Sequence, residues 1–348
     1  MDVKFLLVRP GPTFSVQDVA FGWRDGLREL GVNVADMNFD DRLDFYSSAH
    51  IDRSAGEGEW IKAFDFADAM SLANKSIESV CYEFWPDVVL VVSGHFVRPH
   101  TLALMRARGH HVVLLCTESP YEDDRQLAFC EYADTVLLND PVNLEMFRAR
   151  HPDVHYVPHA YNPAIHHPGA GTPELKSDFA FVGTGFRSRI EFFEAVDFDG
   201  LDVILGGAWV ALDDDSPLVP LIAHRRDWCM DNTDTAEVYR STRSSLNLYR
   251  REAREGEGAH ADGVAMGPRE VELAACETFF IRDPRPESDD VLSMLPTFSE
   301  PAEVRPLLDW WLAHDRERED VAARARAAVV DRTFRNNAEW LVRHLTKG

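Results

Sequence analysis

The chain has 348 residues, of which 45% are hydrophobic and 11% aromatic, so it holds enough apolar material for the cores of two globular domains. Its 36 basic and 59 acidic residues give a formal net charge of −23, a field that repels nucleic acids and anionic membranes unless a local basic patch overrides it. The composition does not exclude a nucleotide-sized anionic ligand, because a few arginines in one place are enough to bind it.

The five cysteines are scattered through the sequence, and no CxxC pair occurs among them. They are expected to be buried free thiols of a reducing cytoplasm, with neither a disulfide framework nor a zinc site. The first apolar stretch is too short for a signal peptide, and no later apolar run is long enough to span a bilayer. The sequence therefore predicts a soluble, cytoplasmic protein.

Short apolar runs bounded by turn residues alternate with helical patterns through the first half of the chain. This alternation predicts parallel βαβ units whose strands are buried on both faces. The predicted strands are Val3–Val8, Val32–Met37, Val88–Val92, Val112–Cys116, Thr135–Leu138 and Val154–Val157. The predicted helices are Val16–Leu30, Glu59–Phe84, Pro99–Arg108, Asp124–Tyr132 and Val142–Arg150.

The Pro/Gly/His-rich stretch His166–Pro173 interrupts this pattern and is the best candidate for a linker. Beyond it the alternation of strands and helices restarts. The predicted strands are Phe179–Val182, Val203–Leu205, Ser245–Tyr249 and Thr278–Ile281. The predicted helices are Arg187–Val196, Asp234–Arg240, a helix opening at Pro268, Ala302–His314, and Arg316–Leu345 with a break near Asp331–Thr333. Two doubly wound α/β halves are therefore expected.

In open parallel sheets, ligands bind beyond the carboxyl ends of the strands, which selects the loops that matter. After the strand Phe179–Val182, Gly183 and Gly185 would let a phosphate approach the backbone, and Arg189 would neutralise it. After the strand ending at Tyr249, that side chain could stack on a base and Arg250 could reach a diphosphate. The polar stretch Glu252–Gly267 that follows is typical of a mobile lid. A tight turn and a strand-end ion pair are the alternative interpretations of these two loops.

The segment Met266–Asp283 is the most informative part of the chain. Pro268 suits the first position of a helix, and the backbone N–H groups of a helix start favour a phosphate. Arg269 adds a planar fork of donors, and Glu272 lies three residues on, along the same helix face. An arginine for phosphate and a carboxylate for ribose or sugar hydroxyls would suit a nucleotide-sugar. The alternative is a capped surface helix with an ordinary ion pair.

In the first half, two residues after apolar strands are candidates for a catalytic base. Glu118 follows the strand Val112–Cys116, and His95 follows the strand Val88–Val92. The loop that begins at Arg9 and contains Gly11 has the composition of a substrate loop. Either candidate base could instead be a polar residue with a structural role.

The acidic runs Asp40–Asp41, Asp123–Asp124 and Asp213–Asp215 are interpreted as solvated faces, and no HExxH spacing occurs, so no metal is predicted. The sequence also lacks a GxSxG elbow and a Walker lysine loop. Their absence argues against a serine hydrolase and a P-loop kinase.

Several segments resemble one known family in order and spacing. They are AFVGTGFRSRIEFF, SSLNLYRRE, GPREVELAACETFFIRD, DWWLAHDRERED and AARARAAVVDRTF, and the resemblance covers essentially Phe179 to Leu345. The stretch resembles the C-terminal half of a glycosyltransferase of the two-Rossmann GT-B type, within the spore-maturation-protein-like (glycosyl transferases group 1) branch that bacteriophages also encode. Two positions depart from the family pattern: Glu277 stands where glycine is usual, and Val264 replaces the first of a glutamate pair.

The resemblance implies an α/β GT-B fold with two Rossmann-like domains facing a cleft and a C-terminal helix that crosses back to the first domain. The expected parts are an acceptor domain over residues 1–167, a nucleotide-sugar domain over 168–330 and the returning helix over 331–348. Arg189, Arg269 and Glu272 match the family's donor site, as do Tyr249 and Arg250.

The expected activity is transfer of a sugar from a nucleotide-diphosphate donor to an acceptor hydroxyl, without a metal or other cofactor. The acceptor would be a protein, a glycan, a small molecule or a modified nucleobase, and the net charge disfavours duplex DNA and membranes. Two alternatives share the bilobal scaffold: a non-catalytic protein that binds sugars or nucleotides, and a sugar-nucleotide epimerase.

Overall fold

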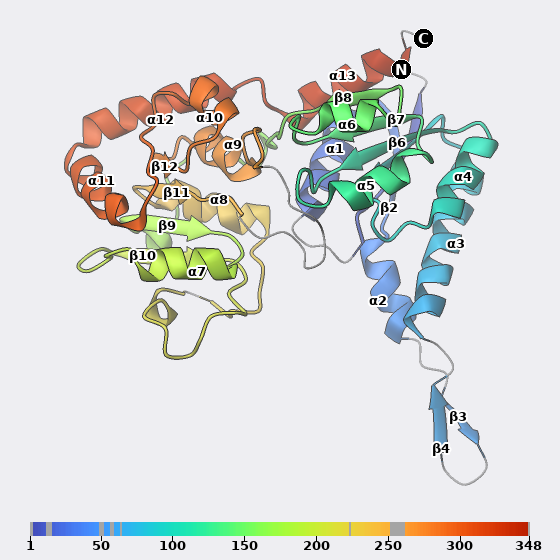
Figure 1. Cartoon of the computed structure of the whole chain (residues 1–348), viewed down its shortest axis with the longest axis horizontal. Helices are drawn as coiled ribbons and strands as arrows, with labels where there is room; N and C mark the ends of the chain where they lie inside the picture. Colours follow the sequence, from blue (N-terminus) through green and yellow to red (C-terminus); the bar gives the residue numbers. More distant parts are fainter. Residues whose placement is uncertain are drawn as a thin grey trace. The chain divides into compact units, whose positions relative to one another are not determined.

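The computed structural model describes residues 3–11, 16–48, 52–55, 59–62, 65–222, 224–250 and 262–346, and its elements are labelled in Figure 1. The chain divides into two compact units. Unit 1 consists mainly of Met1–Val157 and Asn337–Gly348, and unit 2 mainly of Pro158–Ala259 and Gly263–Asn336. Among the described residues, no helix is long and apolar enough to cross a membrane.

Unit 1 is built on a six-stranded parallel sheet with the strand order β2-β1-β5-β6-β7-β8. The strands are β1 (Lys4–Val8), β2 (Asn33–Met37), β5 (Val88–Val92), β6 (His111–Cys116), β7 (Thr135–Leu138) and β8 (Val154–Tyr156). The central strands β5, β6 and β7 are almost entirely buried, as expected for parallel strands covered on both faces.

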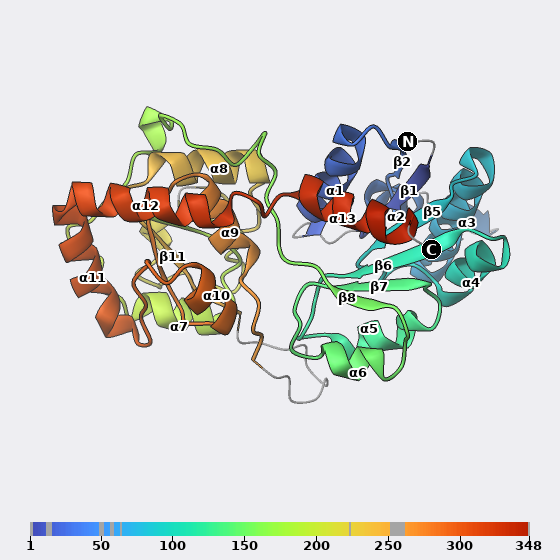
Figure 2. The same ribbon diagram turned by 90° about the horizontal axis from the view of Figure 1, so that it is seen from above.

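Helices cover this sheet and supply its core. They are α1 (Gln17–Glu29), α2 (Asp40–Ser48), α3 (Phe66–Phe84), α4 (Pro99–Ala107), α5 (Asp123–Cys130), α6 (Leu144–Arg148) and α13 (Phe334–Thr346). In Figure 2, α5 and α6 lie on one side of the strands β6 to β8, and α13 lies on the other. Ala338, Leu341 and Val342 of α13 are buried, so the final helix is part of the core of unit 1.

One predicted helix of the first half is wrong at its start. The sequence pattern favoured a helix from Glu59, but residues 59–62 form strand β4 (Glu59–Lys62), which pairs antiparallel with β3 (Asp52–Ala55). The helix α3 begins only at Phe66, because Asp65 caps it. The Asp65 carboxylate accepts the N–H of Asp68 at 2.9 Å, and the Asp68 carboxylate accepts the N–H of Asp65 at 3.1 Å.

Unit 2 contains a four-stranded parallel sheet with the order β10-β9-β11-β12. Its strands are β9 (Phe179–Val182), β10 (Val203–Gly206), β11 (Ser245–Asn247) and β12 (Phe280–Arg282). Its helices are α7 (Arg187–Glu194), α8 (Asn232–Ser241), α9 (Pro268–Ala275), α10 (Pro286–Val291), α11 (Pro301–Ala313) and α12 (Asp315–Val329). The predicted α/β class with parallel sheets in two domains is confirmed.

The stretch His166–Pro173 packs on α8 within unit 2. Arg240 of α8 donates to the carbonyl of Ile165 at 2.8 Å, and the N–H of Thr172 donates to the Ser241 hydroxyl at 2.8 Å. His166 itself is buried, and burial lowers the pKa of its imidazole to about 4.

Glu277 ends helix α9 in a left-handed backbone conformation, with a φ of 59°. The N–H of Glu277 bonds to the carbonyl of Ala274, and the N–H of Thr278 bonds to that of Leu273, each at 3.0 Å. This pattern is a Schellman cap, which favours glycine at the position that Glu277 occupies. The carboxylate lies 3.5 Å from Arg326 of α12, an exposed ion pair.

Candidate functional site

In each unit the strand order reverses at one place, and the loops at the carboxyl ends of the strands meet there. In unit 1 the reversal lies between β1 and β5, because β2 follows β1 on one side and the later strands continue on the other. In unit 2 it lies between β9 and β11. Ligands of doubly wound sheets bind at these reversals, so the loops that follow these four strands define the candidate sites.

Arg269, the second residue of α9, bridges the reversal in unit 2. Its Nε donates to the carbonyl of Val182 at the end of β9 (2.9 Å), and its Nη1 donates to Oδ1 of Asn247 at the end of β11 (3.2 Å). The guanidinium carbon also lies 4.5 Å from the centre of the Phe181 ring. The arginine is therefore held at the carboxyl ends of both strands.

The two glycines after β9 leave room for large neighbouring side chains. A Cβ atom at Gly183 would collide with Nη2 of Arg269, and a Cβ at Gly185 would collide with the indole of Trp209. Gly183 therefore admits the Arg269 guanidinium to the edge of the sheet, whereas Gly185 admits a buried core residue. A contact of either glycine with phosphate stays a prediction.

Two further predicted arginines lie around the same aromatic rings. Arg189 of α7 is buried and donates to the carbonyls of Thr184 (3.0 Å) and Leu248 (2.9 Å), so it also joins the loops after β9 and β11. The guanidinium carbons of Arg189 and Arg250 lie 5.3 and 5.1 Å from the centre of the Phe186 ring. The structure thus brings Arg189, Arg250 and Arg269 together at one edge of one sheet.

Tyr249 lies in a buried polar cluster beneath this edge. Its hydroxyl bonds to the carboxylate of Glu270, which also accepts the N–H of Gly267 (3.0 Å) and the hydroxyl of Ser288 (2.9 Å). The Arg285 guanidinium lies 3.7 Å from the centre of the Tyr249 ring. Stacking of this ring on a base stays untested, and the structure shows the ring engaged by protein groups.

Glu270 is a residue that sequence reasoning overlooked. It is fully buried, and burial raises the pKa of its carboxyl. It fixes the start of α9 by accepting the Gly267 N–H three residues before it, which is the capping-box spacing that could have identified it. The predicted ribose ligand Glu272 lies two residues further along α9 and is partly buried. The segment Glu252–Gly267, predicted to be a mobile lid, lies mostly outside the described residues.

At the reversal in unit 1, Gly11 adopts a left-handed conformation with a φ of 96°. Its N–H donates to Oδ1 of Asp40 at 2.7 Å, and a Cβ atom there would approach Cδ2 of Phe96 to 2.7 Å. The loops after β1 and β5 therefore touch. Only 3% of Asp40 is exposed, and burial raises the pKa of its carboxyl to about 6.

His95 lies in the loop after β5, where the backbone is constrained. Ser93 and Gly94 both have positive φ angles, 64° and 75°, and such a conformation in a serine is costly and frequent at functional sites. Nδ1 of His95 lies 3.3 Å from Oε2 of Glu122, and Arg125 contacts the same carboxylate oxygen at 3.2 Å. Glu122 is thus placed to orient the imidazole, a partner that the sequence did not reveal.

The other predicted base, Glu118, follows β6. Its N–H donates to Oε1 of Gln126 (3.1 Å), and its carbonyl accepts the N–H of Glu122 (3.0 Å). Glu118 is partly buried and stays a candidate base. The interpretation of the acidic runs as solvated faces is wrong for Asp40 and Asp123, which are buried because each accepts several hydrogen bonds.

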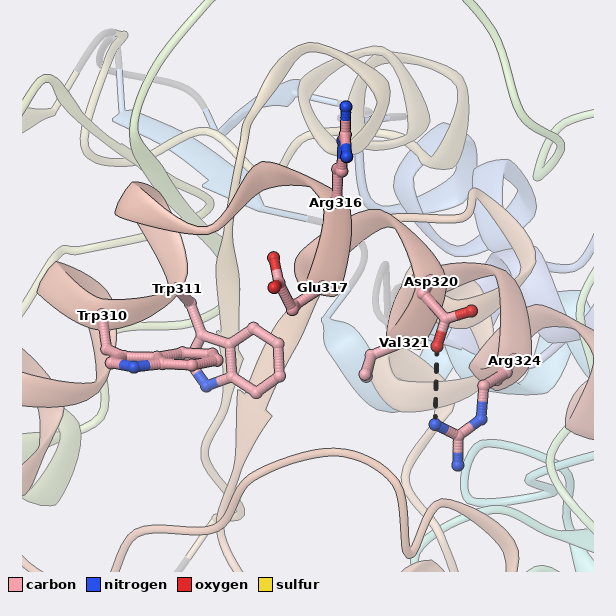
Figure 3. A pocket seen from close by; sticks show the side chains of 7 residues that line it. All are labelled: Trp310, Trp311, Arg316, Glu317, Asp320, Val321 and Arg324. Atoms are coloured by element: carbon pink, nitrogen blue, oxygen red, sulfur yellow. Dashed lines mark ion pairs between the residues drawn. The ribbon is translucent and has the colours of Figure 1, made fainter.

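Two other features lie outside these loops. Within the described part of the chain, one group of side chains could hold a metal ion: Asp153, which precedes β8, His155, which lies within β8, and His344, which lies in α13. A pocket of about 430 Å³ in unit 2 is formed by the corner of α11 and α12. Figure 3 shows its lining, with Trp310 and Trp311 at one end and the Asp320–Arg324 ion pair at the other, and none of the predicted site residues takes part.

Comparison with known proteins places this geometry in context. Residues 187–342, most of unit 2, match the family model described as "Glycosyl transferase-like". No curated protein sequence matches the chain.

Solved structures share the fold over the whole chain. The sucrose-phosphate synthase from Thermosynechococcus elongatus is 13% identical, with a TM-score of 0.63 over 99% of this chain and 98% of that one. An Escherichia coli structure described as "Trehalose-6-phosphate" bound with UDP-2-fluoro glucose is 11% identical, with a TM-score of 0.63 over 98% of each chain.

An α-glucosyltransferase in complex with UDP and a 13-mer DNA containing an HMU base is 11% identical, with a TM-score of 0.62 over 100% of this chain and 99% of that one. These likenesses show the GT-B fold, and the family match over residues 187–342 includes Arg189, Arg250 and Arg269. Assignment to the spore-maturation-like branch and an origin in a bacteriophage stay predictions. The chain thus has the fold of GT-B glycosyltransferases, and residues 187–342 match a glycosyl transferase-like family model.

Proposed function

We propose that the chain transfers a sugar from a nucleoside-diphosphate donor, and that unit 2 binds the diphosphate at the reversal between β9 and β11. The observation that carries this proposal is the position of Arg269, held at once by the end of β9 and the end of β11. Both partners of Arg269, a main-chain carbonyl and a side-chain amide, are neutral, so these hydrogen bonds hold the guanidinium without cancelling its positive charge. Such a charge beside a helix start favours a diphosphate.

The arginines also give the reaction a leaving-group site without a metal. When the bond between the sugar carbon and the diphosphate oxygen breaks, negative charge grows on the diphosphate. Fixed guanidinium groups stabilise that charge without reorganising, a role that a divalent cation takes in other transferases. Metal-independent transfer is therefore part of the proposal. The solved UDP complexes of this fold support a nucleoside diphosphate as the ligand class.

Unit 1 is proposed to bind the acceptor, with His95 as the base. Its imidazole takes the proton of the acceptor hydroxyl as that oxygen bonds to the sugar carbon, and Glu122, 3.3 Å away, stabilises the imidazolium formed. Glu118 is the second candidate for this role. The net charge of −23 favours a protein, glycan or small molecule over duplex DNA as acceptor, although one protein of this fold has been solved with DNA.

The test begins with the donor. Thermal denaturation with UDP-, GDP-, ADP- and dTDP-sugars identifies the nucleotide, because a bound donor stabilises the native state. Arg269→Ala should then weaken binding of that nucleoside diphosphate by about 10- to 100-fold, the effect of losing hydrogen bonds to a charged group worth about 1.5–3 kcal/mol. Arg269→Lys keeps the charge, but it loses the fork and should recover only part of the affinity.

Arg187→Ala is the matched control, because Arg187 opens the neighbouring helix α7 and is 88% exposed in an ion pair with Glu191. It should bind donor as the wild type does. Equal calorimetric affinities for wild type, R269A and R187A would refute the donor site. Incubation with donor alone separates the epimerase alternative, because an epimerase would convert the donor without an acceptor and a transferase would not. The non-catalytic alternative would bind the donor but release no nucleoside diphosphate with any acceptor.

A further inference from the structure

Three side chains on the surface of unit 1 converge on one point, away from the loops at the carboxyl ends of the strands. Asp153 immediately precedes β8, His155 lies within β8, and His344 lies in the last turn of α13. Nε2 of His155 is 2.7 Å from Oδ1 of Asp153, and Nε2 of His344 is 3.1 Å from Oδ2 of the same carboxylate. The three potential ligand atoms all lie within 4.8 Å of one another.

This spacing is close to that of a metal site. Zinc–nitrogen and zinc–oxygen bonds of about 2.0–2.2 Å in a tetrahedron place neighbouring ligand atoms roughly 3.3 Å apart. The two distances to Asp153, 2.7 and 3.1 Å, are both slightly shorter than that value, and small rotations of the imidazoles would complete the geometry. The side chains of His155, Asp153 and His344 are 28%, 32% and 30% exposed, so an ion can reach them from solvent.

Neighbouring residues hold these side chains in place. The hydroxyl of Thr135 donates to Oδ2 of Asp153 at 2.6 Å and lies 2.9 Å from Nε2 of His111. The indole of Trp340, one turn before His344, stacks on its imidazole at 5.3 Å with an interplanar angle of 5°. Partners of this kind orient the ligands of natural metal sites.

We propose that Asp153, His155 and His344 bind a divalent transition-metal ion, with Zn²⁺ as the preferred ion, and that this ion fastens α13 to β8. Two imidazoles and one carboxylate form a donor set that zinc binds well, and water completes the coordination. Asp153 and His344 are 191 residues apart in sequence, and unit 2 lies between them in the chain. The ion would therefore join the two segments of the chain that make up unit 1. The site is structural and takes no part in the proposed sugar transfer.

Metal-free full-length protein, prepared with a chelator and dialysed, tests the site directly. Calorimetric titration with Zn²⁺ should show a binding event of one ion per chain that depends on the three ligands. Thermal denaturation should shift upward with added Zn²⁺, because binding to the native state stabilises it. Co²⁺ in place of Zn²⁺ should show the visible absorption of a cobalt ion coordinated by nitrogen and oxygen.

Two variants remove one ligand each. His344→Gln and His155→Gln can still hydrogen-bond to Asp153 but no longer offer an imidazole. Loss of a residue that only orients a metal ligand weakens metal binding by ~10–100-fold, so loss of a ligand should weaken Zn²⁺ binding by at least that factor. Each variant should also abolish the increase in melting temperature on addition of Zn²⁺. Because His155→Gln leaves α13 unchanged, it keeps the test decisive if His344→Gln fails to fold.

His100→Gln is the matched control, an exposed histidine at the start of α4 in the same unit, and it should bind Zn²⁺ as the wild type does. Binding of nucleoside diphosphate should be the same in all these variants, which separates this test from that of the donor site. Absence of Zn²⁺ binding, or equal Zn²⁺ affinity in wild type, H155Q and H344Q, would overturn the proposal.

Discussion

At the reversal in unit 2, arginine side chains donate to main-chain carbonyls and to an amide, whereas at the reversal in unit 1 an imidazole faces a carboxylate. Both places are built in the same way, from the loops that follow the first strand of the unit and the neighbouring strand where the order reverses, β1 and β5 in unit 1 and β9 and β11 in unit 2. The same backbone geometry thus carries fixed positive charge in one unit and a proton-accepting pair in the other. The difference lies wholly in which side chains follow the strands.

Under the proposed function, the two edges have different tasks. Guanidinium groups bonded to neutral partners retain a field that attracts an anion, so the edge of unit 2 suits binding of a leaving group. An imidazole oriented by a carboxylate can accept a proton and hold the resulting charge, so the edge of unit 1 suits activation of a hydroxyl. Mutations at the two edges should therefore change different kinetic quantities.

The largest effect is expected at His95. Removal of a general base lowers turnover by about 10²- to 10⁴-fold, so His95→Ala should reduce kcat by that factor and leave the affinity for the nucleoside diphosphate unchanged. Glu122→Gln should cause a smaller loss and move the pH profile of kcat, because Glu122 acts through the imidazole. Steady-state kinetics with His100→Ala as control would measure both. A loss of donor affinity in H95A would contradict the proposal that unit 1 acts on the acceptor and unit 2 binds the donor.

The second effect concerns the space that Gly183 leaves for Arg269. Gly183→Ala adds a methyl group where the guanidinium lies, and the resulting displacement should weaken donor binding by about 10- to 100-fold. In an Arg269→Ala background the same change should cost little, because nothing is left to displace. A double-mutant cycle measured by calorimetry gives the coupling. Additive losses would mean that Gly183 acts independently of the arginine.

The two units should also respond to acid in opposite directions at two buried groups. The pKa of His166 in unit 2 is lowered to about 4 by burial, so between there and its ordinary value of 6.5 the unfolded chain binds a proton that the folded chain excludes. Above about pH 6.5 this group does not reduce the free energy of unfolding. As the pH drops below that value the free energy of unfolding decreases, by about 2 kcal/mol at pH 5. His166→Leu should remove that loss, whereas the exposed neighbour variant His167→Leu should not.

Asp40 in unit 1 has the reverse sign. Burial raises the pKa of its carboxyl from 3.8 to about 6, so the folded chain holds a proton that the unfolded chain releases. Stability from this group is present at low pH and declines by about 2 kcal/mol between pH 4 and pH 7. Asp40→Asn should flatten this decline, and the exposed Asp44→Asn should leave it intact. Hydrogen exchange measured across this pH range would report each unit separately, and parallel slopes in wild type and D40N would refute the assignment.

The smallest effect is expected at Glu277, which closes the helix that presents Arg269. A non-glycine residue in the left-handed conformation costs about 1–2 kcal/mol, which a glycine at position 277 would relieve. The greater conformational freedom of glycine in the unfolded chain offsets part of this stabilisation. Glu277→Gly should therefore raise the free energy of unfolding by about 0.5–1 kcal/mol. Glu277→Ala keeps the strained backbone and loses only the exposed pair with Arg326, so it should give no gain. Denaturant titration would distinguish the two variants.

The strands were predictable because parallel strands buried on both faces form short continuous apolar runs, as in Val88–Val92 and Val112–Cys116. The start of α3 was not predictable from the pattern, because the helical pattern continued upstream of Asp65 and only the Asp65–Asp68 capping box marks the boundary. Gly267 and Pro268 predicted a helix start with Arg269 in its first turn, and the structure has it there.

The partners of these residues could not be read from the sequence. The contacts of Arg269 with Val182 and Asn247 depend on the order of strands in the sheet, which periodicity does not encode. The contact of His95 with Glu122 depends likewise on the packing of two loops. The Glu277 position was visible as a departure from the family pattern, but its physical reason, the left-handed helix end, required backbone angles.

The placement of α13 bears on the order in which the protein is made. Residues 337–346 complete the core of unit 1, yet the ribosome synthesises them only after the whole of unit 2. Chains generally fold domain by domain from the N-terminus as they emerge, so unit 1 must wait with the apolar surface under Ala338, Leu341 and Val342 uncovered while unit 2 is translated. During synthesis, unit 2 is thus the first part of this protein that can fold to completion.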